Sequence, residues 1–137
     1  MMMPHSLPET RHVFVYGTLR RGGRNDIAHF FPAPRFVAHA RIHGTMYDLG
    51  SYPGALLGGS GLLVGEVYAV TPMLEAQLDR LEEVRDDDGG EYIKREKAVR
   101  VGAKEIICVV YEVHPERVAG CSVIASGDWF DRAPPFS

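Results

Sequence analysis

Alternating apolar and polar positions predict several short strands and few helices in this chain. The first strand begins at Val13, in a run of β-branched and aromatic residues that favours extended backbone, and it breaks at Gly17. The further strand-like segments are residues 36–49, which bend around Gly44, 62–70, 92–101 and 105–113. We expect the last two segments to form a hairpin that turns at residues 102–104. Several strands and few helices indicate a closed or strongly curved sheet.

The glycine-bearing turn after the first strand is a candidate anion site. Gly17 lets the chain turn sharply where a residue with a Cβ would resist, and the backbone amides of such a turn are free to hold an anion. Beyond the turn, residues 24–31 predict a short helix with Asn25 near its start, which ends before Pro32.

The clearest helix runs from Pro72 to about Glu83. Thr71 can cap its first turn with a hydroxyl, and a proline at the first helical position loses no hydrogen bond that the helix would have made. At about 100° per residue, the leucines form one apolar stripe and the carboxylates form a neighbouring acidic stripe. The apolar stripe comprises Leu74, Leu78 and Leu81, and the acidic stripe comprises Glu75, Asp79 and Glu82.

Glu82 is the carboxylate that we expect to be half-buried on this helix. It lies about 70° from the centre of the apolar stripe, whereas Glu83 points almost directly away, at about 170°. Burial disfavours the charged form of a carboxyl and raises its pKa from about 4.3, which makes the group a better base near neutral pH. Acidic residues on helices are usually solvated, so the helix by itself supplies a candidate acid/base and no more.

Composition fits an ordinary folded domain and leaves its function open. The 137 residues fit one domain, which we place at 1–137 with its core at about 13–129 and both termini peripheral. A content of 45% hydrophobic and 24% charged residues is close to that of soluble globular proteins, and we expect no transmembrane helix. A formal net charge of -3 gives no electrostatic reason to expect nucleic acid as a partner. A solvated loop explains the arginine cluster within residues 20–24 at least as well as phosphate binding.

The cysteines and the first residues of the chain favour a reducing compartment. Cys108 and Cys121 match no zinc or redox spacing and are too few for a disulfide scaffold. Residues 1–10 lack the basic flank and the long apolar run of a signal peptide, so we expect cytoplasmic residence. His39 and His43 are four residues apart, but no acidic motif accompanies them and their segment is extended, so we expect no metal site.

Five short motifs in a fixed order resemble those of a known family. Residues 14–22, Phe-Val-Tyr-Gly-Thr-Leu-Arg-Arg-Gly, resemble the signature of the γ-glutamylcyclotransferase-like superfamily, in its AIG2-like branch that includes γ-glutamylamine cyclotransferases. The other segments that agree with this family are residues 44–55, 64–68, 78–82 and 126–129. The resemblance covers nearly the whole chain, and the order of the motifs argues against chance.

The resemblance implies an α+β fold, a small mixed β-barrel flanked by a few short helices, with a cavity where a loop and one glutamate meet. Carried over position by position, the substrate-binding residues would be Tyr16, Gly17, Thr18 and Leu19. Glu82 would be the catalytic acid/base, so family reasoning and helical geometry select the same glutamate. Tyr111 could also project its hydroxyl into the cavity, as tyrosines in related enzymes do, although an ordinary core tyrosine explains this residue equally well.

The implied reaction converts a γ-glutamyl amine or amide into 5-oxoproline and a free amine, by attack of the substrate's own α-amino group on its γ-carbonyl. It requires no metal or redox cofactor, and its partner is a small γ-glutamyl molecule rather than nucleic acid or a membrane. The attacking amine must lose a proton, which Glu82 could accept and then give to the leaving amine. Amides of the turn could hold the α-carboxylate and stabilise the developing oxyanion.

Several alternatives stay open at this stage. The same cavity could belong to a non-catalytic domain that binds a small carboxylated metabolite, although a pure anion binder would gain little from a buried carboxylate such as Glu82. The chain departs from the family pattern at Glu83, where glycine is frequent, and at the acidic insertion 86–90; both put the identity of the substrate in doubt. The sequence does not identify the amine portion of the substrate, and it fits both a monomer and a homodimer.

Overall fold

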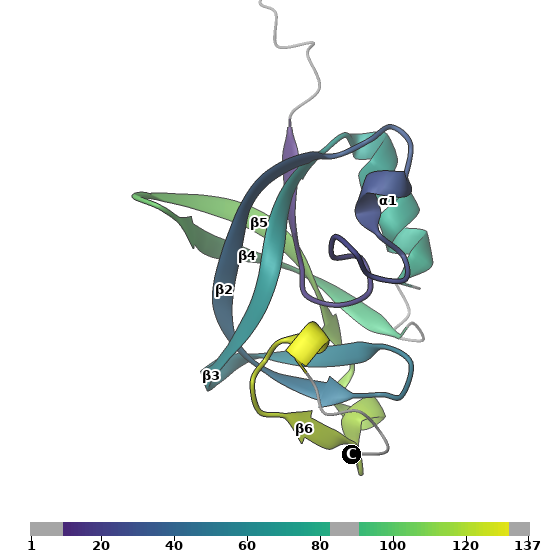
Figure 1. Ribbon diagram of the computed structural model, residues 1–137, viewed down its shortest axis with the longest axis vertical. Helices are drawn as coiled ribbons and strands as arrows, with labels where there is room; N and C mark the ends of the chain where they lie inside the picture. The colour runs from purple at the N-terminus through teal and green to yellow at the C-terminus, as the bar shows by residue number, and fades with distance from the viewer. Residues whose placement is uncertain (1–9, 83–90, 132–137) are drawn as a thin grey trace, which may run out of the picture.

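Six strands form one mixed sheet in the order β4-β5-β1-β3-β2-β6 (Figure 1). The computed structural model describes residues 10–82 and 91–131 of the chain. The strands are β1 (Arg11–Val15), β2 (Arg35–Asp48), β3 (Pro53–Val70), β4 (Tyr92–Val101), β5 (Lys104–Val113) and β6 (Ser122–Ile124). Neighbouring strands are antiparallel except for β1 and β5, which pair in parallel. The expected α+β class with a curved mixed sheet is confirmed.

The sheet curls into a half-barrel because its two longest strands bend together. β2 and β3 run side by side across the molecule (Figure 1). Their register shifts between Phe36 and Ala38 and again between His43 and Gly44, and such irregularities bend a strand. A Cβ at Gly44 would lie 2.7 Å from Cδ1 of Leu63, so glycine permits the close approach at the second bend. The strand order of the described residues ends at β4 and β6, which makes the expected barrel a half-barrel.

β1 lies in the middle of the sheet and is buried on both faces. Val13 and Val15 point to one face and Phe14 to the other, since successive side chains of a strand alternate. Burial on both faces explains why residues 13–15 of this strand are apolar without alternation. Residues that share the core with the two valines include Tyr68, Leu74, Leu78 and Tyr111, and those that surround Phe14 include Met46, Leu63, Val67, Val110 and Trp129.

The clearest predicted helix is α1 (Pro72–Leu81), which packs on the face of the sheet that carries Val13 and Val15. The Thr71 hydroxyl accepts a hydrogen bond from the amide of Leu74 at 3.1 Å, which confirms the predicted cap. The first two leucines of the apolar stripe are fully buried, whereas the third is 42% exposed at the end of the helix. Glu82 follows as the C-terminal cap.

The prediction of a helix over residues 24–31 is wrong. This segment instead contains a single 3-10 turn, η2 (Ile27–His29), and the residue that caps it is Asp26 rather than Asn25. A carboxylate oxygen of Asp26 accepts a hydrogen bond from the amide of Ala28 at 2.9 Å, which a short turn can satisfy without a full helical repeat. The other 3-10 turns among the described residues are η3 (Pro115–Val118) and η4 (Trp129–Asp131).

The strand predictions differ from the structure in extent more than in place. The hairpin of β4 and β5 is confirmed, with Val101 paired to Lys104 across the turn. β3, however, begins at Pro53 rather than at residue 62, since the glycines of its first half interrupt the apolar pattern while backbone pairing with β2 continues. The short strand β6 was not predicted, because three residues carry no readable period.

Some of the expectations concern residues outside the described ranges. They are the direction of Glu83, the acidic insertion at 86–90 and the peripheral placement of the two termini. Within the described ranges, no helix is long and apolar enough to cross a membrane.

Candidate active site

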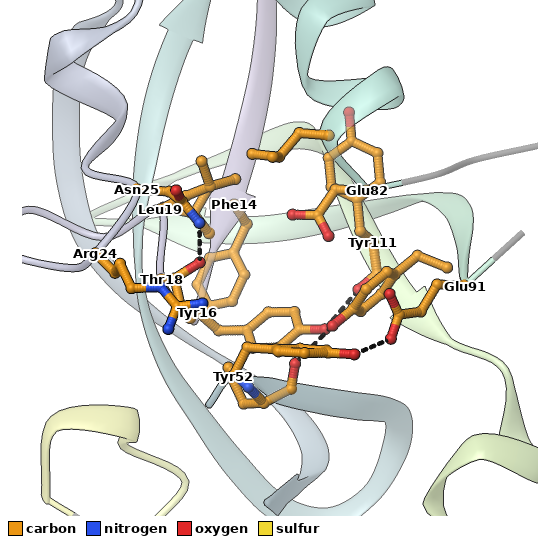
Figure 2. A pocket seen from close by; sticks show the side chains of 15 residues that line it. Phe14, Tyr16, Thr18, Leu19, Arg24, Asn25, Tyr52, Glu82, Glu91 and Tyr111 are labelled. Atoms are coloured by element: carbon orange, nitrogen blue, oxygen red, sulfur yellow. Dashed lines mark hydrogen bonds between the residues drawn. The ribbon is translucent and has the colours of Figure 1, made fainter. Parts of the chain in front are cut away.

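A cavity of about 150 Å³ lies between the turn that follows β1 and the end of α1. Figure 2 shows Thr18, Arg24 and Asn25 on one side of it and Glu82, Glu91 and Tyr111 on the other. The structure therefore brings together, around this one cavity, all of the residues that the sequence nominates for the site, which are Tyr16, Gly17, Thr18, Leu19, Glu82 and Tyr111.

The turn after β1 directs its carbonyl groups into its own loop. The Gly17 carbonyl accepts a hydrogen bond from the amide of Arg20 at 3.0 Å, and the Thr18 carbonyl accepts one from the amide of Asn25 at 2.9 Å. The Asn25 side chain also donates to the hydroxyl of Thr18 at 3.1 Å. No acceptor within the described ranges binds the backbone amides of residues 17–19. These amides are thus available to an anion in the cavity.

Gly17 is required for a different reason from the expected one. Its backbone lies outside the left-handed region, so the turn itself does not demand glycine. A Cβ at Gly17 would lie only 2.7 Å from Cγ of Pro53, a residue that also lines the cavity. The absence of a side chain at residue 17 therefore lets β3 approach the turn and close one wall of the cavity.

A buried ion-pair cluster holds the turn from behind. The Arg20 guanidinium donates to Glu66 at 3.1 Å and to Asp128 at 2.7 Å, while the amide of Arg21 donates to the second carboxylate oxygen of Glu66 at 2.8 Å. Three motifs far apart in the sequence meet in this cluster. The view of these arginines as members of a solvated loop is thus wrong for Arg20, which is buried, whereas Arg24 lines the cavity.

Glu82 is half-buried, as the helical geometry predicts, but it is not alone, because Glu75 of the same acidic stripe is buried as well. Its place directly after α1 fixes its backbone, since its amide donates to the carbonyl of Leu78 at 2.9 Å. Its carboxyl group lines the cavity and has no hydrogen-bond partner among the residues that the structure describes. Burial, and secondarily the negative charge of Glu91, raise the pKa of Glu82 to about 7. A carboxyl of this kind can both take and give a proton near neutral pH.

Tyr16 and Tyr111 line the cavity mainly with their rings, because their hydroxyls are hydrogen-bonded to other protein groups. The Tyr16 hydroxyl donates to the carbonyl of Tyr111 at 2.6 Å and accepts from the amide of Ala55 at 3.2 Å. The Tyr111 hydroxyl donates to Asp79 on α1 at 2.7 Å, so it points toward α1, as an ordinary core tyrosine can, rather than into the cavity (Figure 2). Burial raises the pKa of Tyr16 and of Tyr111, which keeps both phenols neutral.

Other lining residues were not nominated from the sequence. Arg24 forms no ion pair within the described ranges, and its guanidinium lies beside Thr18 in Figure 2. Glu91 accepts a short hydrogen bond from the hydroxyl of Tyr52. Tyr52 falls inside a segment that matches the family, but Arg24 and Glu91 are ordinary charged residues whose sequence context carries no signal. In the described part of the chain, no three His, Cys, Asp or Glu side chains gather to hold a metal.

Comparison with known proteins identifies the family of this chain. A family model described as "Gamma-glutamyl cyclotransferase, AIG2-like" matches residues 13–131. The chain is 34% identical over 121 residues to the gamma-glutamylcyclotransferase family protein YtfP of Escherichia coli K12, a match that covers 88% of this chain and 96% of the relative. It is 40% identical over 73 residues to the gamma-L-glutamyl-butirosin B gamma-glutamyl cyclotransferase of Niallia circulans, covering 53% of this chain and 46% of that enzyme.

Solved structures have the same architecture. The crystal structure of a mouse AIG2-like protein superposes with a TM-score of 0.71 at 25% identity, covering 93% of this chain and 92% of the mouse protein. The solution structure of YtfP from Escherichia coli gives a TM-score of 0.60 at 33% identity, covering 88% of this chain and 97% of that protein. On the family match, the sequence relatives and the fold together, the chain belongs to the AIG2-like gamma-glutamylcyclotransferase family.

Proposed function

We propose that this protein is a cyclotransferase that releases 5-oxoproline and a free amine from a γ-glutamyl amine or amide. One observation carries the proposal. The carboxyl group of Glu82, with a pKa of about 7 and no partner among the described residues, shares a cavity with the open amides of residues 17–19. An anion site and a proton acceptor on opposite sides of one cavity match the two charged groups of a glutamyl α-carbon.

The amides of residues 17–19 hold the α-carboxylate of the substrate. Each amide can donate one hydrogen bond, and hydrogen bonds to a charged acceptor are stronger than those between neutral groups. Arg24 adds a positive charge to the same wall of the cavity. The hydrogen-bond donors and the positive charge that bind the α-carboxylate thus lie on the side of the cavity opposite Glu82. The α-amino group of the substrate then faces Glu82.

Glu82 acts as the base and then as the acid. It takes a proton from the α-ammonium group and releases it to solvent. As the neutral amine forms a bond to the γ-carbonyl carbon, Glu82 takes a second proton from the attacking nitrogen and gives it to the leaving nitrogen, and the bond between that nitrogen and the carbon breaks. Against an amine pKa of about 8, a carboxyl at 4.3 would make the first transfer uphill by about 5 kcal/mol. With its pKa at about 7, Glu82 reduces this to about 1.4 kcal/mol.

The size of the cavity suits ring closure. A volume of about 150 Å³ is that of a site able to hold benzene, and the ring of 5-oxoproline is of similar size. The rings of Tyr16 and Tyr111 line this space and confine the glutamyl chain to a folded shape. Well-aligned intramolecular attack can lower a barrier by about 7 to 11 kcal/mol, so this confinement is a large part of the catalysis.

The test is incubation with a panel of γ-glutamyl amines and γ-glutamyl dipeptides, followed by detection of 5-oxoproline. We expect turnover by the natural sequence and a loss of about 10²- to 10⁴-fold in kcat for Glu82→Gln, which keeps the shape of the side chain but cannot carry the proton. Glu105→Gln, at an exposed position outside the cavity, is the matched control. Undiminished turnover by Glu82→Gln would exclude this mechanism.

The second candidate function is a non-catalytic domain that binds a small carboxylate. The open amides of residues 17–19 and the cationic Arg24 favour it, since they can hold an anion without any chemistry. Glu82, which has no hydrogen-bond partner among the described residues, opposes it, because a negative charge in the same cavity weakens anion binding. Calorimetry distinguishes the two: binding of a γ-glutamyl amine without release of 5-oxoproline, and with affinity that is equal or higher in Glu82→Gln, would favour the binding domain.

A further inference from the structure

Glu91 is the second carboxylate of the cavity, and the proposed reaction does not use it. It lies on the same side as Glu82 and Tyr111 and accepts a hydrogen bond from the Tyr52 hydroxyl (Figure 2). This bond orients the carboxylate without neutralising its charge. The two ends of the cavity therefore carry side chains of opposite charge. Arg24, a cation, lies beside the turn, and Glu91, an acidic residue, lies beyond Glu82.

No cation of the described residues balances the charge of Glu91. The nearest basic residues along β4 are engaged elsewhere: Lys94 pairs with Glu75 at 2.6 Å and with Asp79 at 2.9 Å, and Arg95 pairs with Glu112 at 2.9 Å. Among the described residues, the Glu91 carboxylate accepts a hydrogen bond from the Tyr52 phenol and forms no ion pair. A ligand that brought a positive charge next to it would be bound more tightly than a neutral one of the same shape.

The geometry of the substrate decides which of its groups faces Glu91. In a folded γ-glutamyl group, the α-carbon, the α-nitrogen, the γ-carbonyl carbon and the leaving nitrogen follow one another. If the amides of residues 17–19 hold the α-carboxylate, the leaving nitrogen lies at the other end of this series, on the side of Glu82. Substituents on the leaving nitrogen then extend past Glu82, where Glu91 and Tyr52 line the cavity.

We propose that Glu91, oriented by Tyr52, selects γ-glutamyl amines whose leaving amine carries a second positive charge, and discriminates against leaving groups that carry a carboxylate. This inference rests on the proposed function for the orientation of the substrate. It narrows the substrates to γ-glutamyl derivatives of diamines, polyamines and similar cationic amines. Glu91 is thus a specificity-determining residue, and Tyr52 is its positioning residue.

The test uses three substrates of matched length, the γ-glutamyl amides of 1,4-diaminobutane, of pentylamine and of 4-aminobutanoate. Their leaving groups have the same length and end in an ammonium, a methyl and a carboxylate group. For the natural sequence we expect kcat/KM for the diaminobutane amide to exceed that for the pentylamine amide by about 10-fold, the scale of one hydrogen bond to a charged group. The 4-aminobutanoate amide should be the poorest of the three.

Variants at residue 91 and residue 52 test which group makes the selection. Glu91→Gln should bring the ratio of kcat/KM between the ammonium and methyl substrates close to one, and Glu91→Lys should favour the carboxylate substrate. Tyr52→Phe should reduce the ratio partially. Because each ratio compares two substrates on one variant, it is independent of any general effect of Glu91 on the reactivity of Glu82. Glu105→Gln should leave every ratio unchanged.

The outcomes separate this inference from the proposed function. A ratio near one in the natural sequence, or a preference for the ammonium substrate that survives Glu91→Gln, overturns the role of Glu91. If no amide is turned over, the affinities of the same three compounds are measured by calorimetry. Tighter binding of the ammonium compound that depends on Glu91 would then support the selection while the cyclotransferase proposal fails. Equal affinities, or no binding, would overturn both.

Discussion

The guanidinium of Arg20 lies 3.1 Å from the carboxylate of Glu66, and both side chains are buried behind the turn that carries residues 16–19. Because the other oxygen of Glu66 accepts the amide of Arg21, one carboxylate fixes the chain at two successive residues. The turn can therefore leave its own amides without a described acceptor and still hold a fixed conformation. A rigid scaffold behind an open set of donors is what preorganised anion binding requires.

Substitution of Glu66 by glutamine should destabilise the fold and weaken substrate binding together. We expect a loss of about 3 kcal/mol in the free energy of unfolding, because Arg20 is left buried with an incomplete set of partners. The KM for any γ-glutamyl substrate should rise as the turn loosens. Urea denaturation and steady-state kinetics measure the two effects.

The pair between Arg11 and Glu96 provides the matched control for this substitution. Its length is also 3.1 Å, but the Glu96 side chain is 56% exposed, whereas that of Glu66 is 3% exposed. Glu96→Gln should therefore cost less than about 1 kcal/mol and leave KM unchanged. Equal losses in the two variants would mean that burial of the Arg20–Glu66 pair has no structural role.

The rate of the proposed reaction should depend on the ionisation of Glu82. Since only its carboxylate can accept a proton, kcat/KM should rise with pH and level off above about pH 7. The neighbouring phenols of Tyr16, Tyr92 and Tyr111 have raised pKa values and stay neutral in this range. In Glu91→Gln, the rise should move to lower pH, because the charge of Glu91 contributes to the raised pKa. An unchanged profile in that variant would contradict the coupling.

The free energy of unfolding should also depend on pH through the ionisation of Glu82. The pKa of Glu82 is about 7 in the folded protein and near 4.5 when unfolded, so the folded state binds more protons between these values. The contribution of this group to stability is therefore lost as the pH rises from 4.5 to 7. Glu82→Gln should match the natural sequence below pH 4.5 and be more stable by about 3 kcal/mol at pH 8.

Thermal or urea unfolding at several pH values measures this difference. Glu105→Gln, at an exposed position, should show no comparable dependence. A difference between Glu82→Gln and the natural sequence that stays constant from pH 4 to pH 8 would show that Glu82 is not held in a desolvated site.

Gly17→Ala should distort the cavity, because the added methyl group would clash with Pro53. A methyl group at residue 17 would lie 2.7 Å from Cγ of Pro53, so one of the two segments must shift, at a cost of about 1 to 3 kcal/mol. The shift also moves residues that line the cavity, and we expect a lower kcat/KM. Urea denaturation and kinetics of the single variant provide the baseline for a double-mutant cycle.

The double variant Gly17→Ala with Pro53→Ala tests the cause. Pro53→Ala removes the ring carbon that the new methyl group would strike, so the double variant should be more stable than the sum of the two single losses predicts. Simple additivity of the two losses would place the origin of the damage elsewhere in the turn.

Much of the fold could be predicted because its elements obey local rules. Thr71 and Pro72 mark the start of α1, and the spacing of its leucines fixes the direction of Glu82 relative to the core. The β4–β5 hairpin follows from two alternating runs around one short turn. The first half of β3 was not predictable in the same way, since its glycines form a strand only through pairing with β2.

The features of the site likewise fall into those set by local sequence patterns and those set by tertiary contacts. By itself, the sequence determined the identity of the open turn and of the half-buried glutamate, since a strand that ends in glycine and a helix with a fixed period are local features. Only the tertiary structure decided that Arg24 and Glu91 line the same cavity as these residues. It also decided that Arg20 supports the turn through its ion pair with Glu66, and that the Tyr111 hydroxyl donates to Asp79. These relations join residues distant in the chain, and they arise from packing across the curled sheet, which no local pattern encodes.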